Sequence, residues 1–374
     1  MTKKNEKVFL FIKIFTATIV VHWIIMVFGY ILLTAVGADN TYGGFFSYFY
    51  EKFSASGDVP HYIEIAKNGY AASGDKANLI VFYPLYPALI KIFALVFRDY
   101  FVSGVIISNI CLGVSGYYLY KLADRELGSD KAKDSFALYL LYPMGAFMVQ
   151  AFTESLFMML VLMCLYYIRE NKWLACGIVG LLASISRSQG IALLVPAVYE
   201  AIQYMVHNRK VVIKTASVFL IPVGTFIYLF INKIVQGDFL AFVEHQAAPP
   251  WYNVSHWISD NLAQHYEMAS SYDGLSIIIY WPQIILYFIG IIALFYGLKK
   301  KVAASIVAYG GAYMFLSYLH GWLISGARYM MGCVTLYIIY GAIDNKIVKH
   351  IILLACGIFA VFVVFGMWRG EAIM

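Results

Sequence analysis

The 374-residue sequence has few charged residues: Lys, Arg, Asp and Glu make up only 13% of it, whereas 62% of the residues are hydrophobic. A soluble globular domain needs more polar surface than this composition supplies. The formal net charge is +6, but the basic residues fall in short clusters between apolar stretches, as they do in the loops of membrane proteins. We therefore expect a polytopic membrane protein that binds no nucleic acid.

The sequence also lacks the motifs of several enzyme classes. It has no Walker loop, no GxGxxG and no GxSxG, so nucleotide binding and serine hydrolase chemistry have no support. Its five cysteines lie singly in apolar segments, without the spacing of a disulfide framework. No metal-ligand spacing occurs among the histidines of the polar segments, which are His61, His245, His256, His265 and His320. A metal site is therefore not expected, and no cofactor is indicated.

Long apolar segments dominate the sequence, and a helix needs about 20 such residues to cross a bilayer. Eleven segments come close to this length or exceed it: residues 10–36, 101–121, 135–149, 153–169, 173–186, 189–205, 215–235, 275–298, 302–319, 328–342 and 351–368. Two long loops interrupt them, at 37–100 and 236–273. Because no internal repeat or soluble domain is evident, we expect a single all-α integral membrane domain covering residues 1–374.

Residues 79–97 form a further apolar segment, and the distribution of charge decides whether it crosses the membrane. If it does not cross, most of the 27 Lys and Arg residues fall on the face that holds the N-terminus, which the positive-inside rule assigns to the cytoplasm. If it crosses, every later loop changes side. We therefore expect residues 79–97 to lie as a helix in the outer interface, and both long loops to lie on the outer face.

The polar part of the first loop is residues 57–70, GDVPHYIEIAKNGY, and it contains a conspicuous aspartate. Asp58 precedes Pro60, so it is expected at the N-terminus of a short helix, where backbone amides hold a carboxylate. An ordinary helix cap would explain Asp58 taken alone. The motif VFYPLYP follows at residues 81–87, and together the two motifs favour a carboxylate that carries out chemistry at the membrane surface.

Three further charged residues come at the ends of apolar segments on the same expected face. Glu154 follows Thr153 in a turn, where a capping box is the competing explanation. Arg187 and Arg328 are each bracketed by Ser and Gly. A single arginine at this depth would simply snorkel to the interface. Two of them favour a phosphate site, because the planar guanidinium matches phosphate geometry.

These motifs resemble those of the GPI mannosyltransferase II family, GT-C glycosyltransferases that add the second mannose of the GPI anchor, and of its bacterial relatives. The matching positions of the first two blocks are Asp58, His61, Tyr62, Ile65, Ala66, Gly69, Tyr70, Phe82, Tyr83, Pro84, Tyr86 and Pro87. Residues 153–157, 186–190, 237–246 and 325–329 resemble later blocks. Gly57 departs from the family, which usually has tryptophan there, and the departure is expected to remove an aromatic wall near the acceptor.

The resemblance implies a GT-C fold of about 11 transmembrane helices, with juxtamembrane helices in the first outer loop and a second large outer loop. It also implies transfer of a hexose, mannose in the family, from a polyprenyl-phosphate donor to a lipid-linked or glycan acceptor, with inversion. Asp58 would be the general base. Substrate binding would involve His61, Tyr62, Glu154, Arg187, Gln189, Asp238, Gln246, Arg328 and Tyr329. The N-terminus would be cytoplasmic, and the active site would face outward from a bacterial plasma membrane.

Two other classes of protein stay open on the sequence. A transporter or lipid flippase could use buried charges to line a translocation path, although transporters tend to have internal repeats and broken helices near the midplane. A non-catalytic scaffold would need no cavity that joins Asp58 to the two arginines. The sequence does not decide the acceptor, or between mannose and another hexose.

Overall fold

The computed structural model describes residues 3–37, 43–270, 274–321 and 325–371. Within these ranges the chain is almost entirely helical, and its only extended pairing is one isolated antiparallel bridge between Ser255 and His320. The parts of the two expected loops at residues 38–42 and 271–273 lie outside the described residues. The expected all-α fold class is confirmed.

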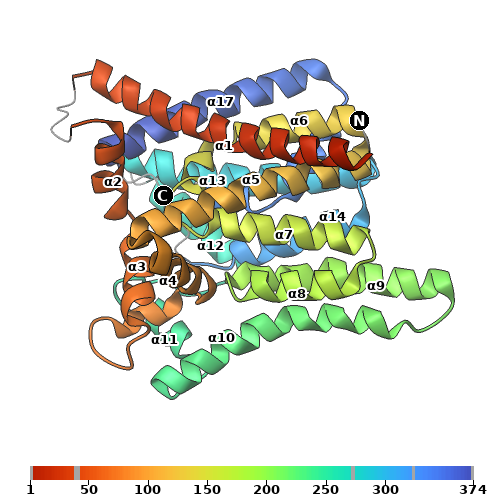
Figure 1. The fold of residues 1–374 in the computed structure, drawn as a ribbon, viewed down its shortest axis with the longest axis horizontal. Helices are drawn as coiled ribbons and strands as arrows, with labels where there is room; N and C mark the ends of the chain where they lie inside the picture. Colours follow the sequence, from red (N-terminus) through yellow and green to blue (C-terminus); the bar gives the residue numbers. More distant parts are fainter. Residues whose placement is uncertain (1–2, 38–42, 271–273, 322–324, 372–374) are drawn as a thin grey trace.

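A row of neighbouring helices forms one side of the molecule (Figure 1). Each packs against the next in the order α17 (Lys346–Arg369), α1 (Lys3–Ala35), α5 (Tyr100–Leu127), α7 (Glu154–Arg169), α8 (Trp173–Ser184) and α10 (Leu220–Gln236). A second group packs against this row and consists of α6 (Ser129–Leu140), α9 (Leu194–Asn208), α13 (Gly274–Lys299), α14 (Ala304–Ser317) and α16 (Thr335–Gly341).

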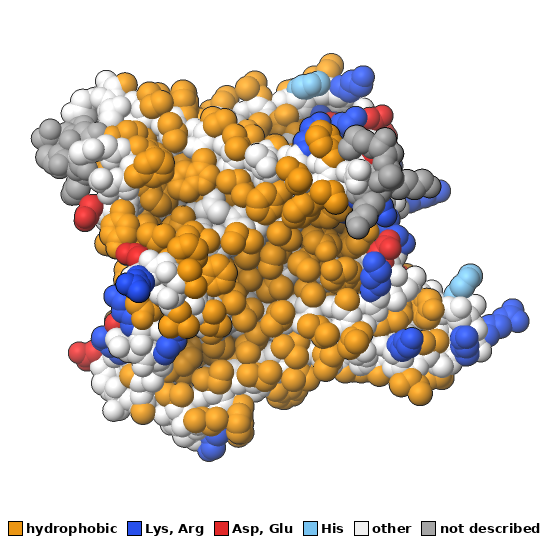
Figure 2. Space-filling model, in the orientation of Figure 1, with side chains coloured by type: hydrophobic (Ala, Val, Ile, Leu, Met, Phe, Trp, Pro, Cys, Tyr) orange, Lys and Arg blue, Asp and Glu red, His pale blue; other side chains and the backbone are white. Residues whose placement is uncertain are grey.

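The described helices have the lengths and surface of a polytopic membrane protein. Six helical stretches are long and apolar enough to cross a membrane, namely Asn5–Ala35, Tyr100–Leu127, Ser188–Asn208, Ile213–Gln236, Ile279–Lys299 and Lys346–Arg369. The other predicted segments also fall on helices, although 135–149 is divided between α6 and the 3-10 helix η2 (Pro143–Met148), and 328–342 between α15 (Gly326–Met331) and α16. Figure 2 shows apolar side chains across the middle of the bundle and charged side chains at its two ends.

Small residues let α5 approach its neighbours closely. A side chain at Gly113 would collide with the ring of Phe15 on α1. At Gly104 the carbonyl oxygen accepts a hydrogen bond of 3.0 Å from the hydroxyl of Tyr86, which lies on α4 (Leu85–Phe97). Close packing of this kind holds helices together in a bilayer, where burial of apolar surface gives no advantage over contact with lipid.

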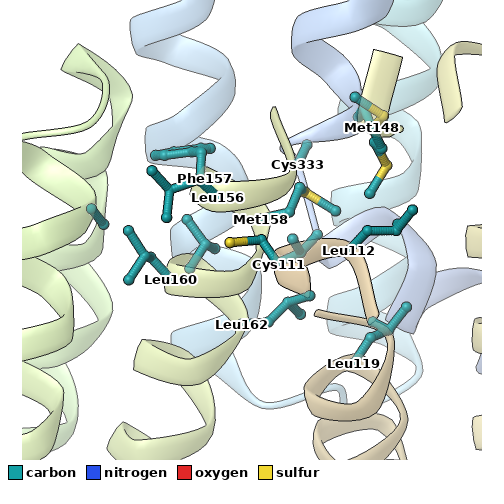
Figure 3. Packing of buried hydrophobic residues seen from close by; sticks show 14 of the residues in the cluster. Cys111, Leu112, Leu119, Met148, Leu156, Phe157, Met158, Leu160, Leu162 and Cys333 are labelled. Atoms are coloured by element: carbon teal, nitrogen blue, oxygen red, sulfur yellow. The ribbon is translucent and has the colours of Figure 1, made fainter. Parts of the chain in front are cut away.

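Buried apolar side chains fill the space between α5 and α7 (Figure 3). Leu112 and Leu119 of α5 and Leu162 of α7 are completely buried. Because α7 begins at Glu154, this packing fixes the end of the helix from which the glutamate projects.

The two long loops lie together at the end of the bundle opposite the N-terminus (Figure 1). The first forms α2 (Phe45–Ser54), α3 (Val59–Asn68), the 3-10 helix η1 (Ala77–Val81) and α4, and the second forms α11 (Ala241–Ala247) and α12 (Ile258–Ser270). The side-chain amide of Gln236 donates to the carbonyls of Ala71 at 3.1 Å and Ala77 at 2.8 Å. The hydroxyl of Tyr228 donates to the carbonyl of Ile80 at 2.7 Å. The end of α10, from which the second loop continues, is therefore docked on the first loop, and α11 of the second loop packs against η1.

Residues 79–97 consist of the end of η1, a short turn and α4. With 13 residues, α4 is about 20 Å long, which is shorter than a hydrocarbon core of about 30 Å. It packs against α3 and α5. This length agrees with the expectation that the segment does not cross, and its place in the outer interface stays a prediction.

Candidate active site

A cavity of about 900 Å³ lies at the end of the bundle that carries the two loops. This volume is large enough for a sugar and its phosphate. Helices α2, α3 and α15, the turn before η3, the second loop and the end of α17 all contribute to its walls. The cavity brings together most of the residues predicted to form the site: Asp58, His61, Tyr62, Arg187, Gln189, Gln246, Arg328 and Tyr329.

Asp58 occupies the N-cap position of α3, as its place before Pro60 predicts, but its side chain makes no capping hydrogen bond. Its Oδ2 instead accepts a bond of 3.0 Å from Nη2 of Arg328. The side chain of Asp58 is 25% exposed, so the carboxylate still reaches the cavity. The cap explanation therefore accounts for the position of Asp58 in the chain but not for what its carboxylate does.

Glu154 joins the two arginines. Its Oε1 lies 2.8 Å from Nη1 of Arg187 and 3.1 Å from Nε of Arg328, and its side chain is only 4% exposed. The same Nη1 of Arg187 donates to the hydroxyl of Thr153 at 3.0 Å. Thr153 makes no capping bond to α7, so a capping box does not explain this turn.

Asp58, Arg328, Glu154 and Arg187 thus form one continuous chain of ion pairs. Two guanidinium groups balance two carboxylates, and the chain is neutral when all four groups are ionised. Removing one member of such a buried set leaves an uncompensated charge, which costs about 3–5 kcal/mol.

Aromatic rings hold the two guanidinium groups in place. The guanidinium carbon of Arg328 lies 5.2 Å from the ring centre of Phe147 and 5.4 Å from that of Phe152. That of Arg187 lies 5.1 Å from the ring of Tyr329. At these distances the rings attract the cations and restrict their orientation.

Phe152 also changes the expectation made for Gly57. The glycine has a φ of +53°, and a side chain there would begin 3.2 Å from the Phe152 ring. Phe152 therefore places an aromatic ring beside Gly57 from another segment of the chain, and the effect of the glycine on the acceptor stays a prediction.

His61 lies among aromatic rings in the cavity wall. Its ring stacks on Phe82 at 5.2 Å and meets Trp251 edge-on at 5.4 Å. Burial lowers the pKa of His61, and the negative charge of Asp58 acts in the opposite direction. Within the described part of the chain the His61 ring makes no hydrogen bond to the Asp58 carboxylate, so Arg328 is the group that orients this carboxylate.

Trp251 and His320 are among the cavity residues that the sequence did not indicate as site residues. The indole of Trp251 donates to the carbonyl of Asn78 at 3.3 Å, which places the second loop over the first. His320 belongs to a short antiparallel pairing in which the Gly321 amide donates to the Val254 carbonyl at 2.7 Å. Burial lowers the pKa of His320 to about 4, and the charge of Arg187 acts in the same direction. This pairing has no local sequence signal.

Two of the predicted residues do not line the cavity. Glu154 lies behind the arginines that it joins. Asp238 is exposed, and its carboxylate accepts a bond of 3.0 Å from the Leu240 amide in the turn before α11. Its expected contact with substrate stays a prediction.

An apolar helical bundle with a charged cavity at one end is the architecture of a polytopic membrane protein with a candidate active site at a membrane face. Residues 78–235, from η1 to α10, match the family model described as dolichyl-phosphate-mannose-protein mannosyltransferase. No curated protein matches the chain. The matched segment contains Glu154, Arg187 and Gln189, whereas Asp58 and Arg328 lie outside it. The match supports a membrane glycosyltransferase, and the finer likeness to the GPI mannosyltransferase II family stays a prediction.

Proposed function

We propose that the protein transfers a hexose, mannose in the first instance, from a polyprenyl-phosphate donor to a hydroxyl group of a lipid-linked or glycan acceptor. The proposal rests on one observation: the partly exposed carboxylate of Asp58 lies in the same cavity as two guanidinium groups, to which it is linked by ion pairs. The similarity of residues 78–235 to a family named for a dolichyl-phosphate-mannose donor supports it. The resemblance of the motifs to those of the GPI mannosyltransferase II family implies the same class of donor.

In the proposed reaction Asp58 is the general base. The acceptor oxygen forms a bond to the anomeric carbon of the donor sugar, and its proton passes to the carboxylate of Asp58. The bond from the anomeric carbon to the phosphate oxygen breaks, and its electron pair leaves with the polyprenyl phosphate. Attack opposite to the leaving group inverts the anomeric configuration. A positioned base of this kind typically contributes about 10²–10⁴-fold to the rate.

The ion-pair chain explains how the site handles the charge that moves. As the phosphate leaves it gains one negative charge, and Asp58 loses one by accepting the proton. Arg328, which Asp58 holds at 3.0 Å, then has a stronger partner in the phosphate than in the neutral carboxyl group. The departing phosphate thus takes over a cation that the base releases, and the net charge of the site does not change.

The rest of the cavity fits a sugar. Gln189, Gln246 and Tyr329 offer hydrogen-bonding groups to hydroxyls, and the rings of His61 and Trp251 provide apolar faces for a pyranose. The lipid tail of the donor would stay in the bilayer beside the apolar surface of the bundle. From the positive-inside rule we expect this end of the bundle to lie outside the cytoplasm.

The donor class is tested with purified protein in liposomes that also contain a bacterial lipid extract as acceptor. One sample receives polyprenyl-phosphate [¹⁴C]mannose and a second receives nucleotide-linked [¹⁴C]mannose at the same concentration. We expect label to enter a product only from the lipid-linked donor, with the anomeric configuration opposite to that of the donor. Transfer from the nucleotide sugar alone, or retention of configuration, would contradict the proposal.

A further inference from the structure

A second cavity, of about 460 Å³, lies where α6, the turn after α16 and the first turns of α17 meet. Its walls include Ile343 and Leu353, and its charged lining residues are Lys131, Asp134, Asp344, Lys346 and Lys349. None of these residues contributes to the candidate active site.

The two cavities lie at opposite ends of one helix. Lys346, the first residue of α17, lines the second cavity, whereas Met367 near the end of α17 lines the first. The 24 residues of α17 span about 36 Å at 1.5 Å per residue, which is close to the thickness of a bilayer. Figure 2 shows Lys or Arg, acidic and His side chains gathered over this end of α17 and α6. The second cavity therefore opens at the membrane face opposite to the active site.

Positive charge is in excess around the second cavity. Lys131 and Lys300 both bind the carboxylate of Asp344, at 2.9 Å and 2.6 Å, and Lys349 pairs with Asp134. The two lysines on Asp344 lower its pKa to about 2, so it is fully ionised at neutral pH. Lys346 has no ion pair within the described ranges of the chain. Four lysines thus face two aspartates.

The cavity also continues into a surface that suits an acyl chain. Ile343 and Leu353 line it. On α17 the neighbouring side chains Ile347, Ile351 and Leu354 are 71%, 62% and 67% exposed and point away from the bundle. A basic pocket that opens onto an exposed apolar helix face has the two features that a phospholipid requires, one for its headgroup and one for its tail.

We infer that this second cavity binds the phosphate headgroup of an acidic phospholipid, with Lys346 and Lys349 as its main ligands and the acyl chains along α17. The existing ion pairs do not prevent this, because Lys346 has none within the described ranges and the pair of Lys349 with Asp134 is only partly buried, the two side chains being 13% and 41% exposed. The inference is independent of the sugar-transfer proposal, because it rests on residues at the other end of the bundle.

The test measures lipid binding to the full-length protein in detergent, by native mass spectrometry and by the shift in thermal unfolding temperature. Phosphatidylglycerol and phosphatidylcholine of identical acyl chains are the two probes, and inorganic phosphate is a third. We expect phosphatidylglycerol to bind and stabilise the protein well above phosphatidylcholine. Because a lysine near an acidic headgroup contributes about 1 kcal/mol, K346Q should weaken phosphatidylglycerol binding about fivefold, and K346Q/K349Q further.

The matched control is K210Q/K214Q, which removes two exposed lysines from the same end of the bundle outside the cavity. Its phosphatidylglycerol binding should equal that of the unaltered protein. Since K349Q removes the partner of Asp134, the single variant K346Q keeps the test valid if the double variant does not fold. Equal binding of the two lipids, equal losses in K346Q and the control, or full stabilisation by inorganic phosphate alone would each overturn the inference.

Discussion

At the scale of single residues, Glu154 does most to hold the candidate active site together, because one of its oxygens binds both arginines. The sequence identifies Asp58, Arg187 and Arg328 as candidates from their neighbours, and the cavity contains all three. It does not predict that the arginines are already paired with carboxylates, because Asp58 and Arg328 are 270 residues apart. Nor does it predict that Phe152 fills the space beside Gly57.

Replacing Glu154 tests its role in stability. E154Q removes the charge between two buried guanidinium groups, so we expect a loss of about 3–5 kcal/mol in the free energy of unfolding. The control is E64Q, which breaks the more exposed pair of Glu64 with Lys76 and should cost less than about 1 kcal/mol. Chemical unfolding in detergent, followed by tryptophan fluorescence, measures both. Equal effects of the two substitutions would show that the ion-pair chain does not stabilise the fold.

Replacing Arg328 tests its role in the reaction. R328K keeps the positive charge but cannot contact Asp58 and a phosphate through one planar group, so we expect kcat to fall about 10²–10³-fold. The binding of donor should weaken less, because Arg187 remains. Transfer assays over a range of donor concentrations separate the two effects. If R328K had a normal kcat, Arg328 would not move from its ion pair with Asp58 to the departing phosphate.

His320 gives a prediction about pH. Its pKa is lowered from 6.5 to about 4 by burial, so the folded protein favours the neutral ring. Between these two values the unfolded chain binds the proton more readily than the folded one, and stability must fall as the pH drops from about 6.5 to 4. H320N removes this loss, whereas H256N, at an exposed histidine of the second loop, should not. Unfolding temperatures at pH 7 and pH 5 provide the comparison, and an identical pH response of H320N and the unaltered protein would refute this account.

At the scale of the elements, apolar segments were predictable and their connections were not. Long apolar runs gave α1, α5, α13 and α17 almost directly, because length and hydropathy alone define them. The sequence predicted one segment at residues 328–342, whereas the structure has two helices there, α15 and α16, with a short irregular stretch between them. The docking of the second loop on the first depends on side-chain bonds to backbone carbonyls, which leave no periodic signal.

Gln236 is the residue whose removal should loosen that docking. Q236A loses two bonds to the first loop and one of 3.0 Å to the ring of His245. We expect faster amide hydrogen exchange in α11 and in residues 248–256, with little change in the temperature of global unfolding, because loops open locally at lower cost than the bundle unfolds. K233A is a suitable control, since the described contacts of the Lys233 ammonium group, with the Gly237 carbonyl and the Phe239 ring, are both close to it in the chain. Unchanged exchange in Q236A would mean that other contacts hold the loop.

At the scale of the whole molecule, the two ends of the bundle carry different cavities, and the orientation of these ends in the membrane is testable. The described native cysteines are buried except for Cys356, which is partly buried, so we expect them to react little with a labelling reagent. When intact cells are treated with a membrane-impermeant maleimide, the variant E244C should react, whereas the variant K210C should react only after lysis. The reverse pattern would place the candidate active site in the cytoplasm.

Whether Asp58 removes the proton from the acceptor is decided by the rate of the transfer step itself. Single-turnover transfer from polyprenyl-phosphate mannose is compared for the unaltered protein, D58N and D75N, the last altering an exposed aspartate of the same loop. We expect D58N to slow transfer by about 10²–10⁴-fold while still binding the donor, and D75N to have no effect. A D58N variant that transfers at the normal rate would contradict this role of Asp58.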